Sequence, residues 1–193
     1  MVSKIIRAFI AAEIDEALRG RLARVMAGLE AADAAVRWVA PENLHWTVKF
    51  LGDVPMNEVG EISKSIEEVA AAHEPFSGQV RGAEPFPDAR RMKLVAVRME
   101  DGGRMGAIRD DLEPYMQEFG VPPDGRGFKA HLTLGRVKGS RNAGALVEAL
   151  AACANRDFGE CHVDELTLFM SELYRQGPTY TPLAHIPLGG TNT

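Results

Sequence analysis

The amino-acid sequence predicts an α+β protein (α/β, two-lobed) in which two βαβ-type lobes follow one another along the chain. The first observation behind this prediction is an alternation of strand-like apolar segments with segments of helical spacing. The second is that the order of elements begins again near residue 92, as in an internal duplication. The third is a short motif at comparable places in the two halves, HWTV at 45–48 and HLTL at 131–134.

The first elements are predicted from apolar spacing. Residues 5–14, IIRAFIAAEI, are rich in Ile and Phe and predict a buried strand. Residues 15–32 carry apolar side chains at helical spacing, and Asp15 is the expected N-cap of this helix. A short extended piece follows, and a turn is expected at 41–43, where Pro and Asn both favour turns.

The first half then continues with a strand, a helix and a second strand. The strand begins at His45 and is ended by Gly52 and Pro55. Apolar residues at helical spacing predict a helix over 57–72, and residues 76–80 predict a strand. The Pro- and Gly-rich stretch that follows, GAEPFPDARR, separates the two halves.

The second half repeats this order. Residues 92–99, MKLVAVRM, predict a strand, and apolar spacing predicts a helix over 104–119. Pro114 lies inside that helix and is expected to kink or break it. A loop is expected over 121–128, VPPDGRGF.

The chain closes with strands and one more helix. The second motif lies in a strand expected over 129–137, and a helix is expected over 143–154. Two closing strands are expected over 162–172, HVDELTLFMSE, and 180–188, YTPLAHIPL.

Composition and charge restrict the class of protein. Hydrophobic residues make up 46% of the chain, and the net charge of −5 argues against coating duplex nucleic acid by charge alone. Cys153 and Cys161 lack CxxC spacing, so reduced thiols in a cytoplasmic protein are expected. Arg7 and Glu13 interrupt the first apolar stretch, so an export signal or a membrane span does not fit there.

Strand alternation predicts how the two motifs present their side chains. Residues i and i+2 of a strand point to the same side. The first motif then presents an imidazole, a hydroxyl and an ammonium on one face and apolar side chains on the other: His45, Thr47 and Lys49 against Trp46, Val48 and Phe50. His131 and Thr133 share a face in the second motif. Each strand would bury its apolar face and leave its polar face for chemistry.

Two imidazoles and two hydroxyls suit displacement at phosphorus. Imidazole titrates near neutral pH, so one copy can accept a proton while the other donates one. Threonine hydroxyls can donate hydrogen bonds to phosphate oxygens, and the Arg136 guanidinium matches phosphate geometry. Strict alternation would point Arg136 away from His131, but Gly135 permits a β-bulge that would return it to the same face.

Other interpretations of the two motifs are weaker. A lone histidine on a strand is more often structural, but two such motifs in strand contexts argue against that explanation. A metal site would need further ligands that the motifs lack, because threonine is a poor ligand. We therefore expect neither a metal nor another cofactor. A serine hydrolase would need a nucleophile elbow, which the sequence does not show.

HWTV and HLTL resemble the paired HxTx motifs of the 2H phosphoesterase superfamily. Within it, the chain is most similar to the RNA 2′,3′-cyclic phosphodiesterase family, formerly called 2′-5′ RNA ligases. The similarity extends to RAFIAAEI, VRWVAPENLHWTVKFLGDV, FKAHLTLGR and LTLFMSELYRQGPTYTPLAHIPL, which together span nearly the whole chain. One departure is Ala130, where the family often has a proline before the second histidine.

The resemblance implies a role for each motif residue. His45 would be the proton donor and His131 the proton acceptor, while Thr47 and Thr133 would hold phosphate oxygens and Arg136 would be the associated basic residue. The implied fold is a pair of pseudo-symmetric lobes with antiparallel sheets that face a central cleft, the 2H phosphoesterase fold. Residues 1–193 would form one two-lobed domain, with approximate lobes at 1–85 and 86–193 that interleave at the closing strands.

The resemblance also implies a substrate and a product. The partner would be RNA with a 2′,3′-cyclic phosphate end, or a cyclic nucleotide, and the product a 2′-phosphate with a free 3′-hydroxyl. The reverse reaction would join RNA ends through a 2′-5′ bond. No membrane partner is implied, and a monomer is expected.

Weaker substrate-binding candidates and rival functions stay open at this point. Phe9 and Phe50 could stack on a base, although alternation favours the core for Phe50 and a buried-looking strand favours it for Phe9. Tyr180 could reach the pocket or pack across strands. The rival functions are a 2H phosphoesterase that acts on a small cyclic nucleotide or a 2′-5′ oligonucleotide, and a non-catalytic module that binds RNA ends.

Overall fold

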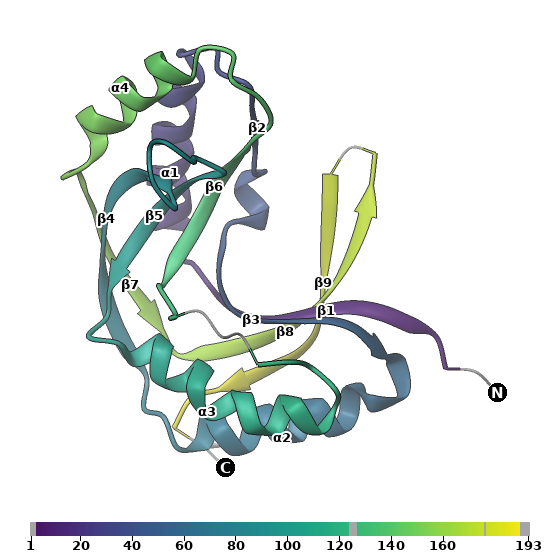
Figure 1. The fold of residues 1–193 in the computed structure, drawn as a ribbon. Helices are drawn as coiled ribbons and strands as arrows, with labels where there is room; N and C mark the ends of the chain where they lie inside the picture. Colours follow the sequence, from purple (N-terminus) through teal and green to yellow (C-terminus); the bar gives the residue numbers. More distant parts are fainter. Residues whose placement is uncertain (1–2, 124–126, 176, 190–193) are drawn as a thin grey trace.

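A nine-stranded sheet and four helices make up the described part of the chain, residues 3–123, 127–175 and 177–189 of a computed structural model (Figure 1). In chain order the elements are β1 (Ile5–Glu13), α1 (Glu16–Glu30), β2 (Val36–Trp38), a 3-10 turn (Pro41–Asn43), β3 (His45–Pro55), a second 3-10 turn (Met56–Glu58), α2 (Val59–Ala71), β4 (Phe76–Phe86), β5 (Leu94–Glu100), α3 (Arg104–Glu118), β6 (His131–Val137), α4 (Ala143–Cys153), β7 (Asp157–Val163), β8 (Glu165–Tyr174) and β9 (Gly177–Pro187).

The sheet consists of two four-stranded groups joined in the middle. Its order is β7-β4-β5-β6-β3-β1-β8-β9, with β2 paired to β6 off this path. Neighbouring strands are antiparallel throughout this order. The two groups join where β3 pairs with β6, at Trp46 and Leu132. The predicted α+β fold with antiparallel sheets is confirmed.

Each group of strands is covered by two helices, one from each half of the chain. Helices α1 and α4 contact each other and lie against β7 and β4, while α2 and α3 lie together against β3, β8 and β9 (Figure 1). Strand β4 comes from the first half of the chain but lies in the group with β5 and β6, and β8 and β9 return to lie beside β1. Both strand groups therefore contain segments from either side of residue 85.

Local sequence explains why these elements form. The Asp15 carboxylate accepts a hydrogen bond from the Leu18 backbone N–H at 2.6 Å, which confirms the predicted helix cap. Along β1 the side chains alternate: Ile10 belongs to the main core, whereas Phe9 and Ala11 belong to a small cluster with Phe169. Strand β1 is therefore buried on both faces: one face packs in the core beneath the helices, and the other packs in the small cluster with Phe169.

Three expectations about single elements need correction. The strand expected over 76–80 extends to Phe86, into the Pro- and Gly-rich stretch that we expected to separate the two halves, since residues 79–86 of β4 pair with β5. The segment 162–172 is not one strand: Asp164 separates β7, which pairs with β4, from β8, which pairs with β1. Helix α3 does not break at Pro114, which lies exposed on the solvent side where a freed carbonyl can bond to water. Within the expected loop 121–128, residues 124–126 lie outside the described residues.

Replacing Gly135 with alanine should destabilise the protein. A Cβ at this position would lie 2.6 Å from Val36 Cγ1 and 2.9 Å from Trp38 Cε3, so β2 would have to move away from β6. Overpacking of this kind costs about 1–3 kcal/mol in the free energy of unfolding, which urea denaturation can measure. Gly60→Ala is the control, because Gly60 lies in α2 with open space around it and should be neutral or stabilising.

Candidate active site

The two histidine motifs meet where the two strand groups join. Trp46 of β3 lies opposite Leu132 of β6, and both side chains are fully buried at 0% exposure. Facing residues of an antiparallel pair have Cα atoms about 4.5–5.5 Å apart. The second residue of each motif, Trp46 or Leu132, therefore packs one strand against the other from the core side.

This register brings the polar residues of both motifs onto the other face. The neighbours of a facing pair continue in antiparallel order, so His45 lies across from Thr133 and Thr47 across from His131. All four side chains are half-buried, in contrast to the fully buried residues between them. The arrangement is pseudo-symmetric, with one imidazole and one hydroxyl contributed by each strand.

A β-bulge in β3 overturns two expectations from strict alternation. Strand β1 pairs with Thr47 and then with Lys49, so Val48 is an extra residue, and the strand reverses its faces there. Lys49, expected beside His45, instead lies on the helix side and is 5% exposed. Phe50, expected in the core, is 64% exposed and has its ring 6.2 Å from that of Phe9.

A matching bulge in β6 places Arg136 on the site face. Strand β5 pairs with Thr133 through Ala96 and then with Gly135 through Val95, so Leu134 is the extra residue. Arg136 then returns to the side of Thr133, where its charge acts on the His45 ring. The bulge follows the threonine in both motifs, so Arg136 in one repeat corresponds to Phe50 in the other.

Both histidines are oriented by the same backbone contact. Nδ1 of His45 lies 2.7 Å from the Asn43 carbonyl oxygen, and Nδ1 of His131 lies 2.8 Å from the Lys129 carbonyl oxygen. A carbonyl oxygen only accepts, so each Nδ1 carries a proton and each Nε2 is free to react. The Nε2 of His45 is 3.0 Å from the Thr47 hydroxyl. In both motifs the acceptor is the backbone carbonyl of the residue two positions before the histidine, Asn43 or Lys129.

The environment of His45 favours the neutral imidazole. Burial lowers its pKa from 6.5 to about 4, the hydrogen bond to Asn43 opposes this shift, and the positive charge of Arg136 adds to it. In the free protein the ring is therefore neutral above about pH 4, with a lone pair on Nε2.

Aromatic rings hold His45 in place. Its ring centroid lies 5.0 Å from that of Phe9 and 5.3 Å from that of Tyr180, which meets it edge-on. Phe9 is 3% exposed and packs on Phe169 at 5.3 Å, so it forms the floor beneath the imidazole rather than a free stacking surface. Burial raises the pKa of the Tyr180 hydroxyl, and the Arg136 charge opposes this shift.

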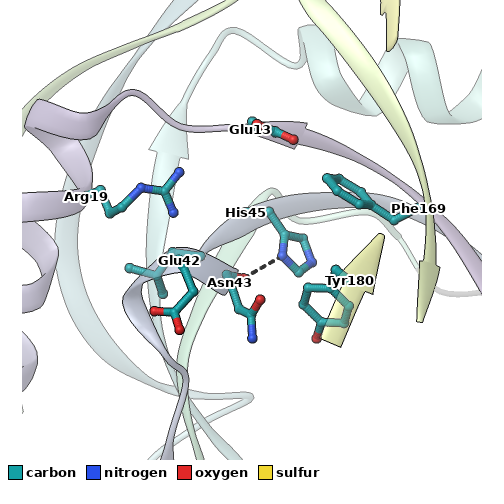
Figure 2. Close-up of a pocket in the computed structure, with 8 residues that line it drawn as sticks. Glu13, Arg19, Glu42, Asn43, His45, Phe169 and Tyr180 are labelled. Carbon is teal, nitrogen blue, oxygen red and sulfur yellow. Dashed lines mark hydrogen bonds between the residues drawn. The ribbon is translucent and has the colours of Figure 1, made fainter. Parts of the chain in front are cut away.

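Sequence reasoning missed several residues around the site. His131 stacks on Phe86, with centroids 4.5 Å apart and planes 12° apart. Phe169 borders a small pocket next to His45, which Asn43 and Tyr180 also line (Figure 2). The Asn43 side chain donates to the Pro178 carbonyl at 3.0 Å and so ties the turn before β3 to β9. No motif marks these residues, because sheet pairing brings them together.

Two findings concern metals and membranes. In residues 3–123, 127–175 and 177–189, no group of three or more His, Cys, Asp or Glu side chains is placed to hold a metal ion. Among the helices of that same part, none is long and apolar enough to cross a membrane.

Comparison with known proteins identifies the family. A family model described as LigT like Phosphoesterase matches the chain twice, over residues 13–96 and 97–180. The chain belongs to this family. Each match contains one motif, so the two halves of this LigT-like phosphoesterase are internal repeats.

Relatives of this phosphoesterase span nearly its whole length. A Methanothermobacter thermautotrophicus protein named RNA 2′,3′-cyclic phosphodiesterase is 37% identical and matches 92% of this chain and 96% of its own. An Aeropyrum pernix protein of the same name is 33% identical, over 86% of this chain and 94% of its own. A crystal structure of a Thermus thermophilus protein has a TM-score of 0.79 at 26% identity, and covers 96% of this chain and 99% of its own. The apo structure of E. coli LigT has a TM-score of 0.73 at 24% identity with the same coverage, which supports the fold.

Replacing Arg136 with glutamine should raise the pKa of His45 above about 4, because a positive charge that disfavours the imidazolium is removed. The measurement is the pH titration of the His45 ring proton resonances by NMR. Arg141→Gln is a matched control, since it removes the same charge from an arginine that pairs with Asp33. A downward shift in Arg136→Gln would contradict the electrostatic coupling.

Proposed function

We propose that the chain is an RNA 2′,3′-cyclic phosphodiesterase, which opens the cyclic phosphate at an RNA end to a 2′-phosphate and a free 3′-hydroxyl. The observation that carries this proposal is the placement of both histidine–threonine pairs on one sheet face around the Trp46–Leu132 pair. Relatives named RNA 2′,3′-cyclic phosphodiesterase, which match this chain over nearly their whole length, support the substrate class.

The phosphate group would lie over the junction of β3 and β6. The Thr47 and Thr133 hydroxyls lie on this face and can donate hydrogen bonds to the non-bridging oxygens. Arg136 supplies a permanent positive charge on the same face, matched to the phosphate anion. These three groups hold the anion and stabilise the charge that develops on its oxygens during attack.

Proton transfer would use the two Nε2 atoms. His131 accepts a proton from water as the water oxygen attacks phosphorus, and His45 donates a proton to the departing 3′ oxygen. The bond from phosphorus to the 3′ oxygen breaks as the new one to the water oxygen forms, so the 2′-phosphate remains. With the 5′-hydroxyl of a second RNA end in place of water, the 5′ oxygen would attack phosphorus and the 3′ oxygen would leave, so the same groups would join the ends through a 2′-5′ bond.

The proton donor must be charged before it can act. Burial keeps His45 neutral in the free protein, so the substrate has to supply the opposing interaction. A bound phosphodiester brings a negative charge next to the ring and offsets the field of Arg136, which raises the pKa of His45. The protonated donor is then formed mainly when the anion is in place.

The first experiment is product analysis with a short RNA that ends in a 2′,3′-cyclic phosphate, in the presence of excess chelator. The expected product carries a 2′-phosphate. His45→Ala and His131→Ala should each lower turnover by about 10²- to 10⁴-fold, because each removes one positioned proton transfer. His162→Ala is the control, since His162 lies in β7 and contacts Ser77.

A 3′-phosphate product would reverse the assignment of the leaving oxygen. Near-normal turnover in His45→Ala would contradict its role as proton donor. Binding without turnover in the wild type would favour a module that only holds RNA ends.

The Phe50→Ala variant tests whether the protein binds a base of the RNA by stacking. Base stacking on an exposed aromatic ring contributes about 1–3 kcal/mol, so Phe50→Ala should raise the KM for RNA several-fold or more. The fold should be little affected because the ring is 64% exposed. Comparing RNA with a mononucleotide 2′,3′-cyclic phosphate shows which base is held: an effect on both indicates the terminal base, and an effect on RNA alone the preceding one. Met56→Ala is the control, and an unchanged KM for both substrates would exclude stacking.

A further inference from the structure

We propose that a buried ionic contact between α3 and β3 positions the two catalytic histidines relative to one another. The contact joins Lys49 of β3 to Glu113 of α3, and Arg109 of the same helix extends it toward the strand that carries His131. This inference rests on the proposed function, because the geometry that it sets is that of the two proton-transfer groups.

The Lys49–Glu113 ion pair connects β3 to α3. Lys49 Nζ lies 2.9 Å from Glu113 Oε2, with the lysine side chain 4% and the glutamate side chain 14% exposed. The bulge at Val48 turns the ammonium toward the helix, two residues after Thr47 and four after His45. The position of the first motif along its strand is therefore tied to one turn of α3.

Arg109 connects α3 to the segment that precedes the second motif. Arg109 Nε lies 3.1 Å from Glu113 Oε1, one helical turn away, and the guanidinium lies 6.0 Å from the centre of the Phe128 ring. Phe128 packs against the core three residues before His131. The next residue, Lys129, provides the carbonyl that orients the His131 ring.

The course of the chain explains why α3 can act in this way. The helix leaves β5 in one strand group, packs on β3 and α2 of the other group, and returns to β6 (Figure 1). The two groups themselves join at Trp46 and Leu132. A helix that contacts β3 directly and the segment before β6 through Phe128 can therefore influence how the two motif strands lie relative to one another.

An ion pair suits this task better than an apolar contact. The hydrophobic effect is non-directional, whereas a charged hydrogen bond requires a fixed direction and distance. Buried pairs add little net stability because desolvation opposes the Coulomb attraction. The reason for keeping Lys49 and Glu113 buried is then geometric, since small displacements of proton-transfer groups cost large factors in rate.

The test uses variants that remove the contact at either end. Lys49→Met and Glu113→Gln should each lower kcat for cyclic phosphate hydrolysis about 10- to 100-fold, with KM changed less than about threefold, since Thr47, Thr133 and Arg136 remain. In Lys49→Met, Glu113 still pairs with Arg109, so no lone buried charge results. Lys49→Arg should restore most of kcat, because it keeps the charge at that place.

A matched control and a double variant separate positioning from folding. Tyr115→Phe removes the hydrogen bond from Tyr115 of α3 to Glu68 of α2 and leaves both motifs untouched, so kcat should stay at the wild-type value. The double variant Lys49→Met/Glu113→Gln should be no slower than the slower single variant, because both changes break one contact. All rates are compared well below the melting temperature of each variant.

A second readout does not depend on turnover. Inorganic phosphate, titrated into the wild-type protein, should shift the ring resonances of His45 and His131 with one dissociation constant, because one anion lies between them. In Glu113→Gln one of the two rings should no longer respond, because the displaced imidazole no longer lies beside the anion. Unchanged coupled shifts together with wild-type kcat in both single variants would overturn the positioning role. A wild type without turnover but with coupled shifts that Glu113→Gln uncouples would overturn only the proposed function.

Discussion

The pairing of Trp46 with Leu132 is the constraint on which the site depends. Both side chains are fully buried, so each strand has only one register in which its large apolar residue stays in the core. A slip by one residue would bury an imidazole and a hydroxyl and expose an indole. Hydrophobic packing on one face of the sheet therefore determines which residues of the two strands face the site, among them His45 and His131.

The two repeats share a β-bulge after the threonine, but the bulge presents a different type of side chain in each repeat. Each strand has a bulge directly after the threonine, which reverses the sides of the residues that follow it; in β3 a second bulge at Leu51 reverses them again. In β6 the reversal presents Arg136 to the site, and in β3 it presents Phe50 and buries Lys49. Internal duplication thus provides two matched halves of a phosphate site, and divergence at one position per half adds charge on one side and an aromatic surface on the other.

Electrostatics in the site depend on the approach of the two strand groups. His45 lies on one strand and Arg136 on another, yet the guanidinium adds to the effect of burial on the imidazole and keeps its pKa low. In the same region α3 contacts β3 through Lys49 and the segment before β6 through Phe128. A bound anion would offset the positive charge of Arg136 at the His45 ring, so proton donation and substrate binding are linked by the same charges.

The sequence by itself determined the order of helices and strands, the Asp15 cap and the common face of each histidine and threonine, because these follow from periodicities of two and 3.6 residues. It also indicated that a bulge could form at Gly135. Only the tertiary structure decided the sides of Lys49 and Phe50, the division at Asp164 and the crossing of α1 and β4 to the other strand group. The physical reason is that bulges and sheet order depend on pairing between strands that are distant in sequence. Local sequence patterns carry no information on the energies of that pairing.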